Sequence, residues 1–149
     1  MMRRALLAMT MLALAGQAQA ATYMVRGGGA ATALAVDLDT VSIHGESRAA
    51  WTYQLFWSRR ALAGRKVEVL AILQAVNCGT KLERALATVQ YTAAGRVLRR
   101  TGPATPWIVS LYGSNTDYIL DAICGTPDAV WARRSAPDVF ALYRRVWPR

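Results

Sequence analysis

Two cysteines, Cys78 and Cys124, are the residues of this sequence whose side chains have the most definite chemistry. Two thiols allow one intramolecular disulfide, and they could instead form a metal-binding pair or a redox pair. Neither cysteine belongs to a Cys-x-x-Cys motif or has a histidine nearby, and metal and redox sites usually need such neighbours. We therefore favour a structural disulfide over the metal and redox alternatives.

Few other residues could support catalysis. His44 is the only histidine, and it lies in His-Gly-Glu, a composition typical of a solvated turn. Asp37 and Asp39 could form a carboxylate pair for acid-base work, but a hydrogen-bonding role at a strand end is the simpler interpretation. Asp117 and Asp121 are spaced for one helix face, and Asp117 fits a helix cap better. The sequence thus predicts a protein that is not an enzyme and has no cofactor or metal.

The N-terminus has the three parts of a secretory signal peptide. Arg3 and Arg4 are followed by the apolar run ALLAMTMLALAG and by Ala18-Gln19-Ala20, which predicts a signal over residues 1–20 with cleavage between Ala20 and Ala21. A membrane anchor is the alternative, but the run is shorter than the ~20 residues that span a bilayer. Because no cysteine lies near the cleavage point, we expect an exported protein in the periplasm or at the cell surface, without a lipid anchor.

The chain is strongly basic, with 18 Lys and Arg against 9 Asp and Glu and a formal net charge of +9. Such a surface favours anionic partners such as lipid headgroups, polysaccharide or acidic proteins. Export makes nucleic acid an unexpected partner. A length of 149 residues with a removable leader suits one domain.

The hydrophobic pattern predicts strands first and helices late. We expect strands over residues 23–26, 33–38, 48–57, 66–78, 82–92 and 96–100, and a loop or a short helical turn over 58–64. Trp51, Tyr53 and Trp57 share one face of their strand, as part of the core or as an exposed platform, and we favour the core. This order predicts an α+β fold, an antiparallel sheet of about five to six strands with a helix packed on one face.

Two Ser-x-x-Asp patterns predict helix starts. Ser114 with Asp117 opens a helix from Asn115 to about Ile123, and Ser135 with Asp138 precedes a last helix over residues 137–146. We divide the chain into the signal peptide, an α+β domain over residues 21–125 and a basic C-terminal helical extension over residues 126–149.

The order of features along the chain resembles that of the bacterial surface-adhesin protein E-like family. The resemblance lies in AVDLDTVSI, AAWTYQLFW, VNCGTKLERALATVQYTAAGRVL and PWIVSLYGSNTDYILDAIC, and it covers residues 23–124. It implies an antiparallel sheet carrying a helix, a bridge between Cys78 and Cys124, and an envelope or surface location. Some members of this family are adhesins that bind host matrix or serum proteins, so the resemblance also implies such binding as a possible activity here. The missing lipidation cysteine and the basic tail after Cys124 depart from the pattern.

Tryptophan and arginine side chains of the tail are the candidate binding residues. They are Trp131, Arg133, Arg134, Arg144, Arg145 and Trp147. They could dock on an anionic membrane surface or on a partner, and the alternative is that the last helix simply packs its apolar side onto the domain.

Two functions are therefore expected from the sequence. The first is a non-enzymatic exported binding protein that resembles surface-adhesin protein E, has an extracellular or envelope protein partner and could form a homodimer through sheet edges. The second is a structural envelope protein whose tail contacts anionic lipid or polysaccharide.

Overall fold

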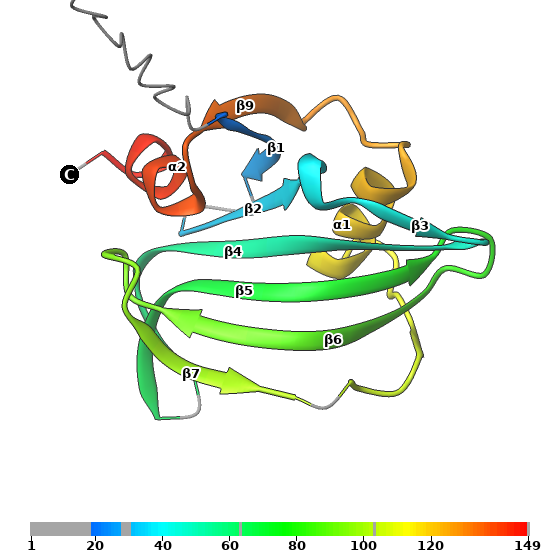
Figure 1. Ribbon diagram of the computed structural model, residues 1–149, viewed down its shortest axis with the longest axis horizontal. Helices are drawn as coiled ribbons and strands as arrows, with labels where there is room; N and C mark the ends of the chain where they lie inside the picture. Colours follow the sequence, from blue (N-terminus) through cyan, green and yellow to red (C-terminus); the bar gives the residue numbers. More distant parts are fainter. Residues whose placement is uncertain (1–18, 28–30, 63, 103, 149) are drawn as a thin grey trace, which may run out of the picture.

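The structure is a computed structural model that describes residues 19–27, 31–62, 64–102 and 104–148. Most of the predicted signal peptide lies outside these residues. The described chain forms one antiparallel sheet of nine strands with two α-helices (Figure 1). The α+β class is confirmed, with more strands than the sequence predicts. The strands are β1 (Ala21–Gly27), β2 (Thr32–Asp37), β3 (Ser42–His44), β4 (Ser47–Leu62), β5 (Arg65–Asn77), β6 (Leu82–Tyr91), β7 (Val97–Thr101), β8 (Ile108–Val109) and β9 (Ala132–Ala136).

The sheet order is β7-β6-β5-β4-β2-β1-β9, so β9 and β7 lie at opposite edges (Figure 1). The short strand β3 continues the line of β2 along β4, after a 3-10 helix over Leu38–Thr40. In the same way β8 continues the line of β7 along β6. Neighbours along the chain are mostly neighbours in the sheet, as expected for hairpin-linked antiparallel strands.

Strand β4 is longer than the pattern of its residues predicts. The expected loop or short helical turn over residues 58–64 is wrong, because β4 runs to Leu62 and pairs again with β5 after a bulge between Leu55 and Arg60. The bulge shifts the alternation, so that the consecutive residues Leu55 and Phe56 are both buried while Trp57 is about half exposed. Between the pairs Leu55–Val69 and Arg60–Val67, four residues of β4 lie opposite one residue of β5, and such an irregularity changes the direction of the side chains that follow it.

The two helices cover opposite faces of the sheet. On β2, Leu34 and Val36 belong to the buried cluster around α1 (Asn115–Cys124), whereas Ala33 and Ala35 belong to the cluster around α2 (Val139–Val146). Successive side chains of a strand point to opposite faces. The expected sheet with helices on one face is therefore corrected to a sheet whose central strands are buried on both faces.

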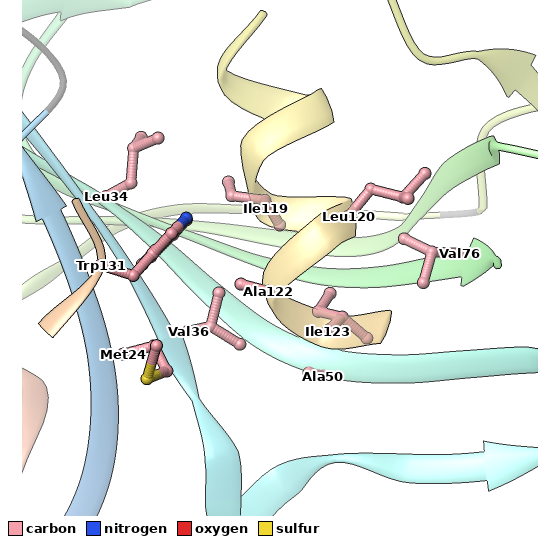
Figure 2. Close-up of a cluster of buried hydrophobic side chains, with 10 residues drawn as sticks. All are labelled: Met24, Leu34, Val36, Ala50, Val76, Ile119, Leu120, Ala122, Ile123 and Trp131. Atoms are coloured by element: carbon pink, nitrogen blue, oxygen red, sulfur yellow. The ribbon is translucent and has the colours of Figure 1, made fainter. Parts of the chain in front are cut away.

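The first cluster joins α1 to the sheet. Ile119, Leu120 and Ile123 of the helix pack with Leu34, Val36 and Val76 of the strands, as Figure 2 shows. Each of these side chains is almost wholly removed from solvent. Burying an aliphatic side chain of this size contributes roughly 1.5–3 kcal/mol to stability.

Helix α1 has well-defined ends. The Ser114 hydroxyl accepts a hydrogen bond from the Asp117 amide, and the Asp117 carboxylate accepts one from the Gly113 amide. Gly125 ends the helix in the left-handed conformation with φ of 83°, and Arg48 donates to the carbonyl of Ile123 at 3.0 Å. The predicted cap at Ser114 is confirmed.

The segment after Cys124 is part of the same sheet and core. It contains strand β9, which the sequence analysis missed, and β9 pairs with β1 in the register Tyr23 to Arg134. The N-cap of α2 is Asp138, which accepts from the Ala141 amide, while Ser135 lies within β9. The predicted start of this helix is therefore corrected by two residues, to Val139.

Helix α2 is fixed to the sheet by apolar and polar contacts. Leu142 and Tyr143 are fully buried against Tyr23, Leu55 and Val69. The Tyr143 hydroxyl also donates a hydrogen bond to the carbonyl of Phe56 at 2.8 Å. Because buried polar groups need such partners, this bond specifies where α2 sits on β4.

Candidate functional site

Cys78 and Cys124 are joined in a disulfide, with an S–S distance of 2.05 Å. The bridge connects the end of β5 to the last residue of α1. No cysteine of the described chain carries an unbonded thiol. The predicted disulfide between these two cysteines is therefore confirmed, and their bonded sulfur atoms are not free thiolates that could bind a metal.

The two tail tryptophans predicted as binding residues are packed into the protein. Trp131 is only 7 % exposed and belongs to the cluster around α1, where Figure 2 shows it beside Leu34 and Ile119. Trp147 packs edge-to-face on Trp57 with ring centroids 5.3 Å apart. Trp131 thus has a core role, because a buried ring offers little area to a partner.

The four tail arginines predicted to bind are all exposed, but the structure does not bring them to one place. Arg133 and Arg134 are adjacent on edge strand β9, so they point to opposite faces. Arg134 and Arg145 line one cleft between β9 and α2, of about 400 Å³. Arg144 lines a different cleft with Trp147. The four arginines are therefore divided: Arg134 and Arg145 share one cleft, Arg144 lies in the other, and Arg133 lines neither of these two clefts.

A run of large apolar side chains is exposed at the sheet edge that carries β8. We call this run the apolar strip, and it consists of Trp107, Ile108, Val109, Leu111 and Tyr112. Val109 is 65 % exposed and Tyr112 is 99 % exposed. Exposed apolar residues are common singly, whereas a contiguous patch usually marks an interaction site. The sequence analysis did not select these residues as a binding site, although WIVSLY is a dense apolar run directly after Pro106.

The backbone holds the apolar strip against β6. Ile108 pairs with Glu83, and the Ser110 amide donates to the Lys81 carbonyl at 3.1 Å. Trp107 lies under the guanidinium of Arg84, 4.7 Å from the ring centroid. Among the described residues β8 pairs only with β6, so its other edge faces away from the sheet. Two residues of the strip, Ile108 and Val109, therefore form a short strand at the edge of the sheet, and the other three flank that strand.

A polar cluster lies buried beneath the start of α1. Thr52 donates a hydrogen bond to the Gln74 side chain, and Gln74 donates to the Glu83 carboxylate. Burial raises the pKa of Glu83, and hydrogen bonds from Thr116 and Gln74 partly oppose that rise. The side chains of Thr52, Gln74 and Glu83 are almost completely buried from solvent. This hydrogen-bonded cluster is therefore part of the core, and a substrate cannot reach it.

The other candidates for catalysis take structural positions. Asp37 accepts a hydrogen bond from the Asp39 amide and caps the 3-10 helix, while Asp117 supports the start of α1. His44 ends β3 at a turn. Within the described ranges no group of three or more His, Cys, Asp and Glu side chains has the arrangement of a metal site.

Comparison with known proteins does not identify a family for this chain. No protein-family model matches the chain, no curated protein matches it, and no solved structure matches it.

In the part of the chain that the structure describes, neither helix is long and apolar enough to cross a bilayer.

Proposed function

We propose that this protein is a non-enzymatic exported binding protein that docks on a protein partner through the apolar strip. The observation that carries the proposal is the exposure of five large apolar side chains in six consecutive positions at an ordered sheet edge. Leaving such a patch in water is unfavourable by about 25 cal/mol for each Å² of apolar surface. A partner that covers the patch removes this cost.

The sheet edge favours a protein partner over insertion into lipid. An unpaired strand edge carries backbone N–H and C=O groups, and hydrocarbon offers these groups no hydrogen-bond partner. An extended segment of another protein can pair with them and cover alternate side chains at the same time. The exposed arginines Arg99 and Arg100 on β7 lie on the same edge, so the partner segment is expected to carry acidic residues beside its apolar ones.

Export and the adhesin resemblance belong to the same proposal. The disulfide supports export, because disulfides form and persist in oxidising compartments outside the cytoplasm. An antiparallel sheet whose bridge ties a strand end to the end of a helix supports kinship with the surface-adhesin protein E-like family. We extend the proposal to an envelope or surface location and an extracellular partner.

A matched pair of substitutions tests the apolar strip. Val109 and Ile43 are each 65 % exposed, on β8 and β3, so Val109→Asp and Ile43→Asp add the same charge at equally exposed sites. The probes are synthetic extended peptides with apolar residues at alternate positions and either acidic or basic flanks. We expect the acidic-flanked peptides to bind, and Val109→Asp to weaken them about tenfold or more, as for the loss of an interface anchor. Fluorescence polarisation measures both affinities.

Other occupants of the strip give different results. A dimer seen by light scattering that Val109→Asp dissociates would identify a second copy of this chain as the occupant. Flotation with neutral vesicles that is lost only in Val109→Asp would identify lipid and contradict the protein partner. Equal peptide affinities for wild type, Val109→Asp and Ile43→Asp would refute a binding role of the strip.

The exposed tail arginines support a second candidate function, contact with anionic lipid or polysaccharide. Arg134 and Arg145 line one cleft and Arg144 lines another, and the whole chain is basic. Attraction of this kind weakens as salt screens it, since the Debye length is about 10 Å at 0.1 M ionic strength. Binding to anionic vesicles that fades with salt and disappears in Arg134→Ser/Arg145→Ser would favour this function.

A further inference from the structure

A third cleft lies on the sheet face that carries α2, away from the apolar strip. It is a cleft of about 340 Å³ between the sheet and the start of α2, and we call it the aromatic cleft. Five aromatic rings and two carboxylates line it: Tyr23, Trp51, Tyr53, Tyr91, Phe140, Asp37 and Asp138. A pocket with aromatic walls and a few polar groups is the usual form of a small-ligand site.

The strand register brings these residues together. Tyr23 of β1 lies directly opposite Asp37 of β2, and Tyr53 of β4 lies opposite Ala35 of β2 and Ala71 of β5. Residues paired in this way share a face of the sheet. The small residue Ala71 lines the cleft between larger side chains, and the rings of Tyr23 and Tyr53 meet edge-to-face at 6.2 Å.

The charge of the aromatic cleft is opposite to that of the protein. None of its lining residues is basic, although the chain carries a net charge of +9. Asp37 is only 7 % exposed and forms no ion pair within the described ranges. Its Oδ1 atom accepts a hydrogen bond from the Asp39 amide at 3.1 Å, and hydrogen bonds from the Asp39 and Thr40 backbone partly oppose the rise in its pKa that burial causes. A buried carboxylate without a cationic partner is unfavourable, and a bound cation would offset that cost.

The protonation of the groups around the cleft agrees with an electronegative site. Burial raises the pKa of Asp37. Burial, with the nearby Asp37 charge as the next cause, raises the pKa of Tyr23 to about 12. Burial, with the nearby Tyr23 as the next cause, also raises the pKa of Tyr53. The phenols therefore stay neutral at physiological pH and present their rings beside the carboxylate.

We propose that the aromatic cleft binds an organic ammonium group, such as the side chain of a lysine or a small free amine. The negative face of an aromatic ring attracts a cation within about 6 Å of its centre. The Asp37 carboxylate adds an ion pair, which is strongest where water is excluded. A neutral sugar could stack on the same rings but would gain nothing from the unpaired charge. This inference does not depend on the apolar strip.

The test titrates the disulfide-bonded protein with three probes. Nα-acetyl-lysine methylamide presents a peptide lysine, n-butylamine presents a free amine, and Nα-acetyl-norleucine methylamide is the neutral counterpart of the first. We expect the ring signals of Tyr23 and Tyr53 in nuclear magnetic resonance to shift with the cations and not with the norleucine compound. Binding of the lysine probe alone would indicate a peptide source, and binding of both cations would indicate a site for amines in general.

Substitutions locate the binding. Asp37→Asn keeps an acceptor for the Asp39 amide and removes the charge, and we expect about tenfold weaker binding or more. Asp121→Asn, which removes a carboxylate on α1 that pairs with Lys81, is the control and should bind as wild type does. Should Asp37→Asn fail to fold, Trp51→Leu removes one half-buried ring and should weaken binding several-fold while Asp37 stays in place.

Three results would overturn the proposal. The first is equal binding of the norleucine and lysine compounds, and the second is unchanged affinity in Asp37→Asn or, where that variant does not fold, in Trp51→Leu. The third concerns Ala21, which itself lines the cleft. Should a chain that begins at Gln19 bind the amines while a chain that begins at Ala21 does not, the α-ammonium group of Ala21 fills the site and no external ligand is needed.

Discussion

At the scale of single residues, burial decides which of several chemically similar side chains has which role. Trp131 and Trp107 are both flanked by loops and near arginines in the sequence, yet Trp131 is in the core and Trp107 lies at the exposed edge. Glu83 is a carboxylate on a strand like many surface residues, but it is buried with Thr52 and Gln74. The residue type alone does not tell whether a side chain is buried or exposed, because burial depends on contacts between segments that are distant in the sequence.

Glu83 gives a prediction for the dependence of stability on pH. Its folded-state pKa is raised above the ordinary value of 4.5, mainly by burial. The folded protein therefore binds this proton more tightly, so its contribution to stability is complete below pH 4.5 and is lost as pH rises through the folded pKa. We expect Glu83→Gln, which keeps an acceptor for Gln74, to reduce this loss. Urea titrations of both proteins at several pH values from 4 to 8 measure it.

One result of these titrations would contradict the prediction for Glu83. A difference in the free energy of unfolding between wild type and Glu83→Gln that does not change with pH would show that Glu83 has the same pKa in the folded and unfolded states. An exposed carboxylate, Asp39→Asn, serves as the reference substitution.

At the scale of elements, two similar sequence patterns have different outcomes. Both Ser114 and Ser135 are followed three residues later by an aspartate. Ser114 caps α1, whereas Ser135 lies in β9, because pairing with Thr22 of β1 holds it in an extended strand. Tertiary strand pairing overrides a local cap signal when the neighbouring strand is already in place.

This difference predicts unequal effects of the same substitution. Ser114→Ala removes the acceptor of the Asp117 amide and should lower the free energy of unfolding by about 1 kcal/mol. Ser135→Ala removes an exposed hydroxyl and should change it by less than about 0.5 kcal/mol. Chemical denaturation of the two variants gives both values, and equal losses would mean that the Ser114 hydroxyl bond adds nothing to the stability of α1.

At the scale of the whole molecule, the segment after Cys124 completes the fold. Strand β9 covers the outer edge of β1, and α2 covers the face formed by Tyr23, Leu55 and Val69. Loss of single buried residues such as Leu142 costs about 2–5 kcal/mol. Domains of this size are stable by only about 5–15 kcal/mol, so the protein cannot lose the whole segment and keep its structure.

Deletion of residues 126–149 should therefore abolish the cooperative thermal transition seen by circular dichroism. Arg144→Ser/Arg145→Ser keeps the buried residues of α2 and should retain that transition, which makes it the suitable variant for asking whether the tail binds anionic surfaces. A deletion that still unfolds cooperatively near the wild-type midpoint would show that residues 21–125 fold alone.

Local patterns were sufficient for much of this protein. The period-two alternation of most strands, the cap at Ser114 and the one possible pairing of the two cysteines follow from the sequence itself, and the structure agrees with them. Tertiary structure alone decided that β9 joins β1, that the helices cover opposite faces, that Trp131 is buried and that Asp37 sits among aromatic rings. These features depend on register and packing between segments far apart in the chain, and no local pattern records which distant residues will meet.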